Sequence, residues 1–99
     1  NKLNGSIPEG IGHLTMLTRL DLAWNKLVGE IPQSISKLTR LTALLLSGNH
    51  LRGEVPAGMV EALTGLEVLY LPAHLTGRAR VGRMCNVSQA SYKYVKCKS

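Results

Sequence analysis

Apolar and polar side chains alternate in three short stretches of the chain, and this alternation predicts strands. In residues 19–23, two leucines alternate with Arg, Asp and Ala, and residues 43–47 and 68–72 repeat the arrangement. A period of two indicates a strand with one buried face. The apolar residues at 27–38 then point inward from the path that leads to the next strand.

The alternating stretches belong to a longer repeat with a step of 24 residues. Five columns share this step: Asn1/Asn25/Asn49, Leu3/Leu27/Leu51, Gly5/Gly29/Gly53, Ile7/Ile31/Val55 and Pro8/Pro32/Pro56. The leucines at 17, 20 and 22 return at 41, 44 and 46, and then at 66, 69 and 71 with an offset of 25. The extra residue falls between Met59 and Leu63, where we expect a fuller helical turn. Self-similarity at a fixed period of this length is typical of repeat architectures.

The best-preserved copy is residues 17–38, LTRLDLAWNKLVGEIPQSISKL. It reads L-x-x-L-x-L-x-x-N-x-L-x-G-x-I-P-x-x-I-x-x-L and resembles the plant-type leucine-rich repeat, which is marked by L-x-G-x-I-P. Similar sequences occur in plant receptor kinases, receptor-like proteins and polygalacturonase inhibitors. The resemblance covers residues 1–77, and it implies an α/β fold. That fold is a short right-handed solenoid with a parallel sheet on its concave face and short helical turns on its convex face.

Two full copies of 24–25 residues, flanked by partial ones, fill residues 1–77, and residues 78–99 are expected to form a basic cap or tail. The first copy starts at its Asn and lacks a strand, so we expect an uncapped N-terminal end. The chain also begins without a Met or a signal segment, and we interpret it as a short or truncated member. In the tail, the alternation of SYKYVKC predicts an added edge strand.

Asn25 and Asn49 fall where the chain leaves each strand. A buried Asn amide needs hydrogen-bond partners, and we expect it to bond backbone groups of its own and the next coil as a structural ladder. The last copy aligns only if its Asn is deleted, with His74 matching His50. An imidazole is not expected to replace the missing amide.

Side chains that alternate with the core leucines face outward, where the fold itself does not require apolar residues. We predict a recognition patch there, made of Arg19, Asp21, Trp24, Leu45, Val68 and Tyr70. The resemblance implies a non-enzymatic module that binds a protein, peptide or glycan on this face, as in extracellular receptors or defence-related inhibitors. The alternative is a neutral surface or one that contacts neighbours missing from this sequence.

Charge adds a second candidate site. The net charge of the 99-residue chain is +6, but residues 1–77 hold six basic and six acidic side chains. The whole excess therefore lies in the tail, on Arg78, Arg80, Arg83, Lys93, Lys96 and Lys98. These residues suit binding of a polyanion at a cell wall or membrane surface. We expect an acidic polysaccharide as the partner rather than nucleic acid. The alternative is a tail that only adds solubility.

Two features concern the cellular compartment. Cys85 and Cys97 lie outside the repeats, and the residues alone leave open a disulfide or two free thiols. Two cysteines after the last copy resemble the disulfide caps of extracellular leucine-rich repeats. The sequons Asn4-Gly5-Ser6 and Asn86-Val87-Ser88 mark Asn4 and Asn86 as candidates for glycosylation. Together these features predict an extracellular or cell-surface protein.

The sequence offers little for catalysis. No Cys and His spacing suits a metal site, and no Ser/His/Asp motif, phosphate loop or kinase motif is visible, so we expect no cofactor and no enzyme activity. No apolar run is long enough to span a bilayer. Ice binding is a minor alternative, because Thr15, Thr39 and Thr64 share a column, although Glu67 breaks the second column of Thr18 and Thr42.

Overall fold

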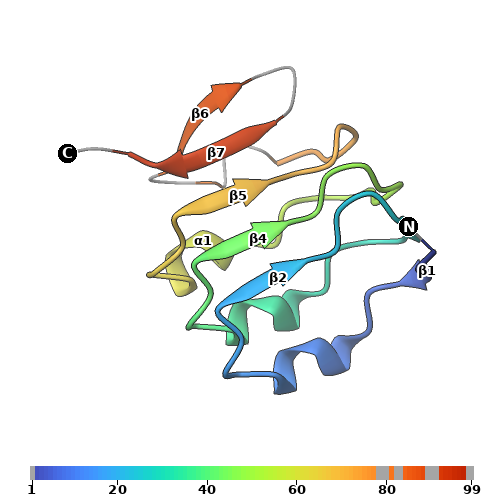
Figure 1. Cartoon of the computed structure of the whole chain (residues 1–99), viewed down its shortest axis with the longest axis horizontal. Helices are drawn as coiled ribbons and strands as arrows, with labels where there is room; N and C mark the ends of the chain where they lie inside the picture. Colours follow the sequence, from blue (N-terminus) through green and yellow to red (C-terminus); the bar gives the residue numbers. More distant parts are fainter. Residues whose placement is uncertain (1, 78–80, 82–83, 89–91, 98–99) are drawn as a thin grey trace.

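A computed structural model of the chain describes residues 2–77, 81, 84–88 and 92–97 (Figure 1). In chain order, the described elements are β1 (Asn4–Ser6), η1 (Glu9–His13), β2 (Arg19–Asp21), β3 (Lys26–Val28), η2 (Gln33–Lys37), β4 (Ala43–Leu45), α1 (Met59–Ala62), β5 (Val68–Tyr70), β6 (Met84–Ser88) and β7 (Lys93–Lys96). The labels η1 and η2 denote 3-10 helices.

The strands predicted from the alternation form one sheet in the order β2-β4-β5-β7-β6. The first three strands run parallel, and Leu20, Leu44 and Leu69 lie side by side in register. The parallel solenoid sheet is therefore confirmed. The strand predicted in the tail is present as β7, but it is not at the edge: β7 pairs antiparallel with β5, and β6, which the sequence did not predict, pairs antiparallel with β7 and forms the edge.

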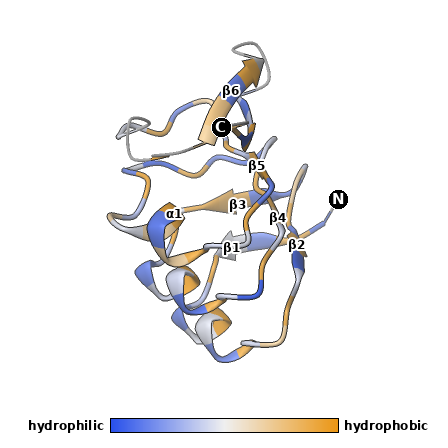
Figure 2. Ribbon diagram, turned by 90° about the vertical axis from the view of Figure 1, so that its left-hand side faces the viewer, coloured by the Kyte–Doolittle hydropathy of each residue, from blue (hydrophilic) through white to orange (hydrophobic). Residues whose placement is uncertain are grey.

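The return paths stack on the opposite side of the molecule from this sheet (Figure 2). There β1 and β3 pair in parallel, and a single bridge between Glu54 and Thr76 continues the stacking in later coils. Gly29 and Gly53 adopt φ of +82° and +85°, a region that favours glycine. Each copy then makes a short helical turn, and only α1, which contains the inserted residue, is α-helical. Its backbone hydrogen bonds, from Ala62 N–H to Gly58 O and from Leu63 N–H to Met59 O, confirm the predicted fuller turn.

The core is a single column of aliphatic side chains between the sheet and the return paths. Its central members have no solvent exposure at all: Ile35, Leu38, Leu41, Leu44, Leu46, Leu51, Val55, Met59, Leu63, Leu66 and Leu69. Almost all occupy the repeat columns of the sequence. The repeat therefore specifies the core directly, because each coil places the same side chains against its neighbour.

The predicted Asn ladder is present, but it runs in the other direction along the solenoid. The Asn49 Nδ2 group donates to Leu46 O and Ser47 O of its own coil and to Leu22 O of the preceding coil, at 2.8–3.2 Å. Its Oδ1 accepts the Leu27 N–H at 3.1 Å. The inter-coil bonds thus reach backward rather than to the next coil, because the turn after each strand lies beside the completed coil.

Asn25 makes the same kind of contact one coil earlier. Its Oδ1 accepts the Leu3 N–H at 3.1 Å, and its Nδ2 donates to Leu22 O and Ala23 O. Both asparagines are buried, with exposed fractions of 8% for Asn25 and 6% for Asn49. In the last copy His74 is exposed, so it does not take the buried place of the amide, as expected.

The two ends of the solenoid differ. At the C-terminal end, the β6–β7 hairpin covers the last repeat and buries Val81, Met84 and Tyr94. The Cys85–Cys97 disulfide closes this hairpin, so the disulfide reading is the correct one. At the N-terminal end, Leu3 and Leu14 are 53% and 51% exposed.

Candidate functional site

The outward side chains of the sheet form two rows across the strands. Because β2, β4, β5 and β7 are in register, Asp21, Leu45, Tyr70 and Lys93 occupy one row. Asp21, Leu45 and Tyr70 are therefore lateral neighbours, about 5 Å apart along the hydrogen-bonding direction. It also adds a tail residue to the row, because β7 is part of the same sheet.

Three of the six predicted patch residues lie together in one groove. Trp24, Leu45 and Tyr70 line a hollow of about 710 Å³ at the end of the strands where the chain turns toward the return path. The complete lining is Ala23, Trp24, Leu45, Ser47, Gly48, Asn49, His50, Tyr70, Leu71, Pro72, Ala73, His74 and Tyr92. The other three predicted residues, Arg19, Asp21 and Val68, are not part of this lining. The structure therefore divides the predicted patch into an aromatic groove and a neighbouring strand surface.

Trp24 forms the wall of the groove on the side of β2. It lies in the turn after the strand, not in the strand itself, and its side chain is 69% exposed. Its φ is +60°, in the left-handed region that is costly for residues other than glycine. The repeat-equivalent residue is Gly48, with a φ of +71°. One coil thus uses glycine at this backbone position. The preceding coil places there the single tryptophan of the protein.

The Trp24 ring lies against the backbone of Gly48. A Cβ atom built on Gly48 would overlap the Cε3, Cδ2 and Cζ3 atoms of the indole. Any side chain at position 48 would therefore displace the ring. Gly48 is needed for the shape of the groove as well as for its own positive φ.

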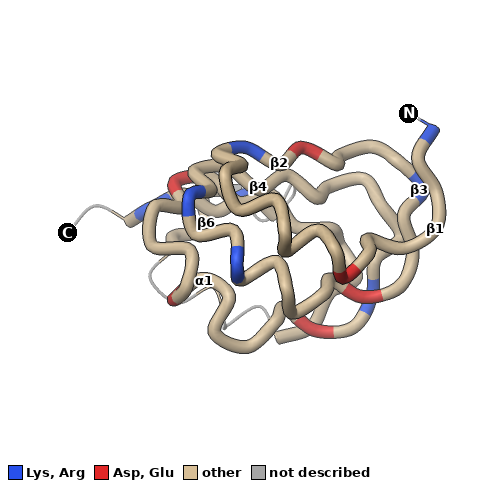
Figure 3. The backbone as a smooth tube through the Cα atoms, turned by 90° about the horizontal axis from the view of Figure 1, so that it is seen from below, with Lys and Arg blue, Asp and Glu red and all other residues tan. Residues whose placement is uncertain are grey.

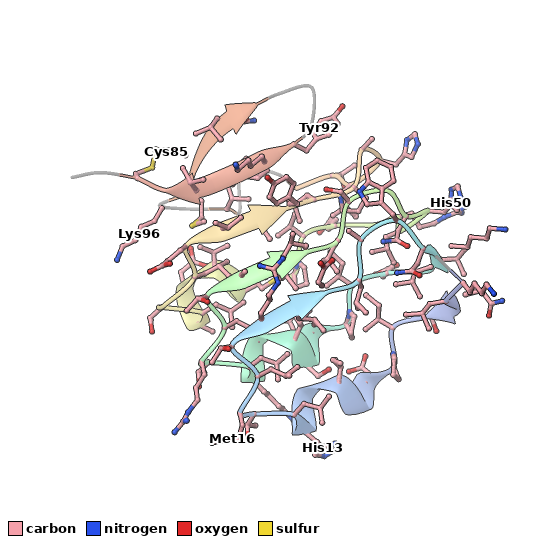
Figure 4. All side chains as sticks on the ribbon, in the orientation of Figure 1. His13, Met16, His50, Cys85, Tyr92 and Lys96 are labelled. Atoms are coloured by element: carbon pink, nitrogen blue, oxygen red, sulfur yellow. A yellow bond between two sulfur atoms is a disulfide. The ribbon has the colours of Figure 1, made fainter. Side chains whose placement is uncertain are left out.

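The opposite wall comes from β5 and the cap. Tyr92 precedes β7, and its carbonyl accepts the Leu71 N–H at 3.1 Å, which ties the cap to the last repeat at the groove. The Lys93 ammonium lies 5.3 Å from the centre of the Tyr70 ring, within cation–π range. Figure 4 shows Tyr92 and His50 on the same side of the molecule, away from Cys85 and Lys96.

The lining of the groove has a simple chemistry. It contains aromatic and aliphatic surface, two histidines and neutral polar groups, but none of its residues is Asp, Glu, Lys or Arg. The Ser47 hydroxyl is buried and has no hydrogen-bond partner among the described residues. A buried hydroxyl without a partner costs folding free energy.

Sequence reasoning missed several lining residues. From the sequence, His50 serves only to align His74, and His74 is considered only as a poor substitute for Asn. Tyr92 was assigned to the tail, because nothing in the sequence places the tail beside the turns of the repeats. The one sequence signal for Gly48 as a lining residue is that it occupies the same repeat column as Trp24.

The remaining candidates lie on other surfaces. Arg19 and Asp21 form an exposed ion pair at 3.6 Å, which is a weak surface contact. Glu9, Glu30 and Glu54 line a second recess of about 550 Å³, and acidic segments gather beside β1 and β3 in Figure 3. Within the described residues, no group of three or more His, Cys, Asp and Glu side chains is placed to hold a metal ion.

The predicted polyanion residues are only partly described. Arg78, Arg80, Arg83 and Lys98 lie outside the described residues. Lys93 belongs to the concave row, and Lys96 is exposed at the end of β7. The sequon residues Asn4 in β1 and Asn86 in β6 are both exposed. In the part of the chain that is described, no helix combines the length and apolarity needed to cross a membrane.

Comparison with known proteins bears on this fold and surface. The family model of the leucine-rich repeat matches residues 16–38. A chain of the BIR3–SERK2 complex from Arabidopsis thaliana is 43% identical over 78% of this chain and 42% of that chain, with a TM-score of 0.72. The plant peptide hormone receptor RGFR1 in complex with RGF2 is 33% identical over 73% of this chain and 11% of that chain, with a TM-score of 0.67.

A plant ice-binding protein is also similar, at 39% identity over 66% of this chain and 21% of that chain, with a TM-score of 0.62. A search of the curated proteins finds no match. The chain is a leucine-rich-repeat protein of the plant type, the type found in plant receptor ectodomains. It spans less than half the length of each of these three solved structures.

Proposed function

We propose that this chain is a non-enzymatic recognition module that binds its ligand in the aromatic groove of the concave face. The observation that carries the proposal is the meeting of Trp24, Leu45 and Tyr70 in one hollow with Tyr92 of the cap. Aromatic side chains are enriched among the residues that dominate binding energy. A rigid sheet also holds these side chains in place before the ligand arrives, which lowers the entropic cost of binding.

The extracellular location is part of the same proposal. The Cys85–Cys97 disulfide is typical of proteins that pass through an oxidising compartment. Similarity to a plant peptide hormone receptor and to a receptor-type complex supports a peptide or protein ligand ahead of a glycan. We include glycosylation at Asn4 and Asn86 in the proposal, since both side chains are exposed.

The test uses selection from a displayed library of random peptides on the purified 99-residue chain. We expect the selected peptides to lose at least about tenfold in affinity with Trp24→Ala or Tyr70→Ala, while the thermal melt is retained. Met16→Ala is the matched control, because Met16 is apolar and as exposed as Trp24, at 69%, but lies outside the groove. Equal affinity in all variants would overturn the groove as the binding site.

Polyanion binding by the tail is the alternative function. Its dependence on salt concentration distinguishes it from recognition in the groove. Binding through Lys93, Lys96 and the tail arginines would weaken steeply with ionic strength. Recognition in the groove depends on apolar contact, because its lining carries no Lys, Arg, Asp or Glu, so we expect little change between low and physiological salt. Ice binding is tested separately by thermal hysteresis, with the exposed Thr39 changed to Lys.

A further inference from the structure

We propose that the open edge of β2 pairs with the same strand of a second copy of this chain, antiparallel and in one register, to form a two-fold symmetric dimer. This dimer is separate from the groove, and neither depends on the other. It gives a role to Arg19 and Asp21, which lie outside the lining of the groove. The supporting observations are the free backbone groups of β2, the order of its two charges and the apolar surface beside it.

Strand β2 lies at one edge of the five-stranded sheet, and only its β4 side is paired. On that side, Thr18 O and the Leu22 N–H make hydrogen bonds to the coil of β4. Successive residues of a strand direct their backbone groups to opposite sides, so those of Arg19 and Asp21 point to the open edge. An open strand edge is a template for pairing with another chain.

The open stretch of this edge is short and has a defined end. Just after β2, the Ala23 N–H donates to the Asp21 carboxylate at 3.1 Å, and Ala23 O accepts from the Asn25 side-chain amide at 3.2 Å. The side chains of the same coil therefore use the backbone groups of Ala23. The groups that β2 offers to a further strand are those of Arg19 and Asp21.

The order of the two charges favours one way of pairing. An antiparallel pair centred on Leu20 sets Arg19 opposite Asp21 of the second copy, and the symmetry repeats this contact on the other side of the axis. Both are hydrogen-bonded pairs, in which the two residues exchange both N–H···O bonds. Opposite charges directly across a ladder are stabilising, whereas a parallel pair in register would set Arg19 against Arg19 and Asp21 against Asp21.

Apolar surface flanks the same edge. Leu14 and Met16 precede β2 and are exposed. Leu3, also exposed, lies beyond the other end of β2, next to β1 (Figure 1). A two-fold axis through Leu20 reverses the direction of the strand, so it brings Leu14 and Met16 of one copy toward Leu3 of the other. The dimer thus covers apolar surface that a single copy leaves in water.

The other edge of the sheet does not offer the same match. Strand β6 has no charged residue, and its pairing with β7 is irregular between Asn86 and Ser88. Irregularities of this kind protect strand edges from pairing with other chains. The edge of β2 is therefore the one whose charges specify a partner strand.

Sedimentation equilibrium of the purified 99-residue chain, with its disulfide intact, measures the association. We expect a monomer–dimer equilibrium with a dissociation constant below about 500 µM. Arg19→Asp and Asp21→Arg each set like charges across both pairs, so each should weaken the dimer at least about tenfold. Glu61→Arg is the matched control for Asp21→Arg, because it makes the same change of charge at an exposed residue of α1, away from β2 (Figure 1).

Exchange of the charges gives the sharpest result. A mixture of the Arg19→Asp chain with the Asp21→Arg chain has opposite charges at both pairs, so we expect a heterodimer of about wild-type affinity, identified by native mass spectrometry. The chain that carries both changes should form a homodimer again. Where one reversal does not fold, the other reversal and this double variant give the same comparison.

A wild-type chain that stays monomeric at about 1 mM would overturn the dimer. Dimers that neither single reversal weakens would also overturn it, because the apolar ends would then associate without pairing of β2. A mixture of folded single variants that recovers no heterodimer would contradict the assigned register. Peptide binding in the groove is measured separately with Trp24→Ala, so failure of the dimer leaves the proposed function standing.

Discussion

The two ends of this solenoid present the same kind of apolar coil edge to very different surroundings. At the C-terminal end, the hairpin β6–β7 continues the sheet and buries Tyr94 to 4% exposure against the last repeat (Figure 1). At the N-terminal end, Leu14 and Met16 lie at 51% and 69% exposure. Figure 4 shows Met16 and His13 at the opposite end from Tyr92 and Cys85.

The difference shows what a cap does in a repeat protein. Each coil buries its apolar edge only against its neighbours, so an end without a neighbour leaves that edge in water. The hairpin supplies the missing neighbour at one end, although it shares no sequence with the repeats. It also contributes Tyr92 to the lining of the candidate groove, and its Lys93 ammonium lies 5.3 Å from the centre of the Tyr70 ring. The hairpin therefore both covers the last repeat and completes the candidate groove.

The largest expected effect comes from removing the buried ring of the cap. Tyr94→Ala should lower the free energy of unfolding by about 3 kcal/mol or more, because it leaves a cavity between β7 and the last repeat. Leu14→Ala at the open end should cost less than about 1 kcal/mol, since half of that side chain is already in water. Denaturant titration of both variants measures the contrast, and similar losses would show that the two ends are not different.

Removing the disulfide should have the next largest effect on stability. Cys85→Ser combined with Cys97→Ser should cost about 2–3 kcal/mol, as expected for a bridge that closes a loop with a sequence separation of 12. The loss should fall on the cap first. Hydrogen exchange at the Leu71 amide, which donates to Tyr92 O, should quicken more than exchange at the Leu22 amide, which donates to Leu45 O. Uniform quickening of both amides would contradict a cap that opens separately.

The smallest expected difference in stability is between Asn49, in the middle of the solenoid, and Asn25, near its N-terminal end. Asn49→Ala removes three donated hydrogen bonds and one accepted bond from the middle of the solenoid, at an expected cost of about 2–3 kcal/mol. Asn25→Ala should cost about 1 kcal/mol, because its inter-coil bond goes only to Leu3 at the open end. Melting curves that rank the variants in the reverse order would contradict the assigned roles.

The repeat columns allowed the central fold to be predicted almost completely. Leu44 and Leu69 were assigned to one face of the sheet from alternation alone, and they lie side by side without any exposure. The inserted residue before Leu63 was assigned to a fuller turn, and α1 is the one α-helical turn described. These predictions succeed because each contact joins equivalent positions of adjacent copies, so periodicity along the chain becomes proximity in space.

The lining of the candidate groove was predicted only in part, and the reason is again physical. Trp24, Leu45 and Tyr70 were found because they break the expected polarity of the outward columns. Arg19, Asp21 and Val68 share those columns but lie outside the groove, since its hollow forms beyond the strand ends. The direction of the Asn ladder was also wrong, because a column of equivalent residues does not state which neighbouring coil an amide meets.

The sequence by itself determined the repeat, the strand faces, the buried asparagines and the position of the charge excess in the tail. Each of these follows from local periodicity or from a simple count along the chain. Only the tertiary structure decided that the tail folds back as two antiparallel strands, that Tyr92 completes a groove with Trp24, and that the Trp24 ring occupies the space over Gly48. The first two features join a non-repeating segment to the repeats, and the third depends on how one side chain lies on the neighbouring coil, so the periodicity of the sequence encodes none of them.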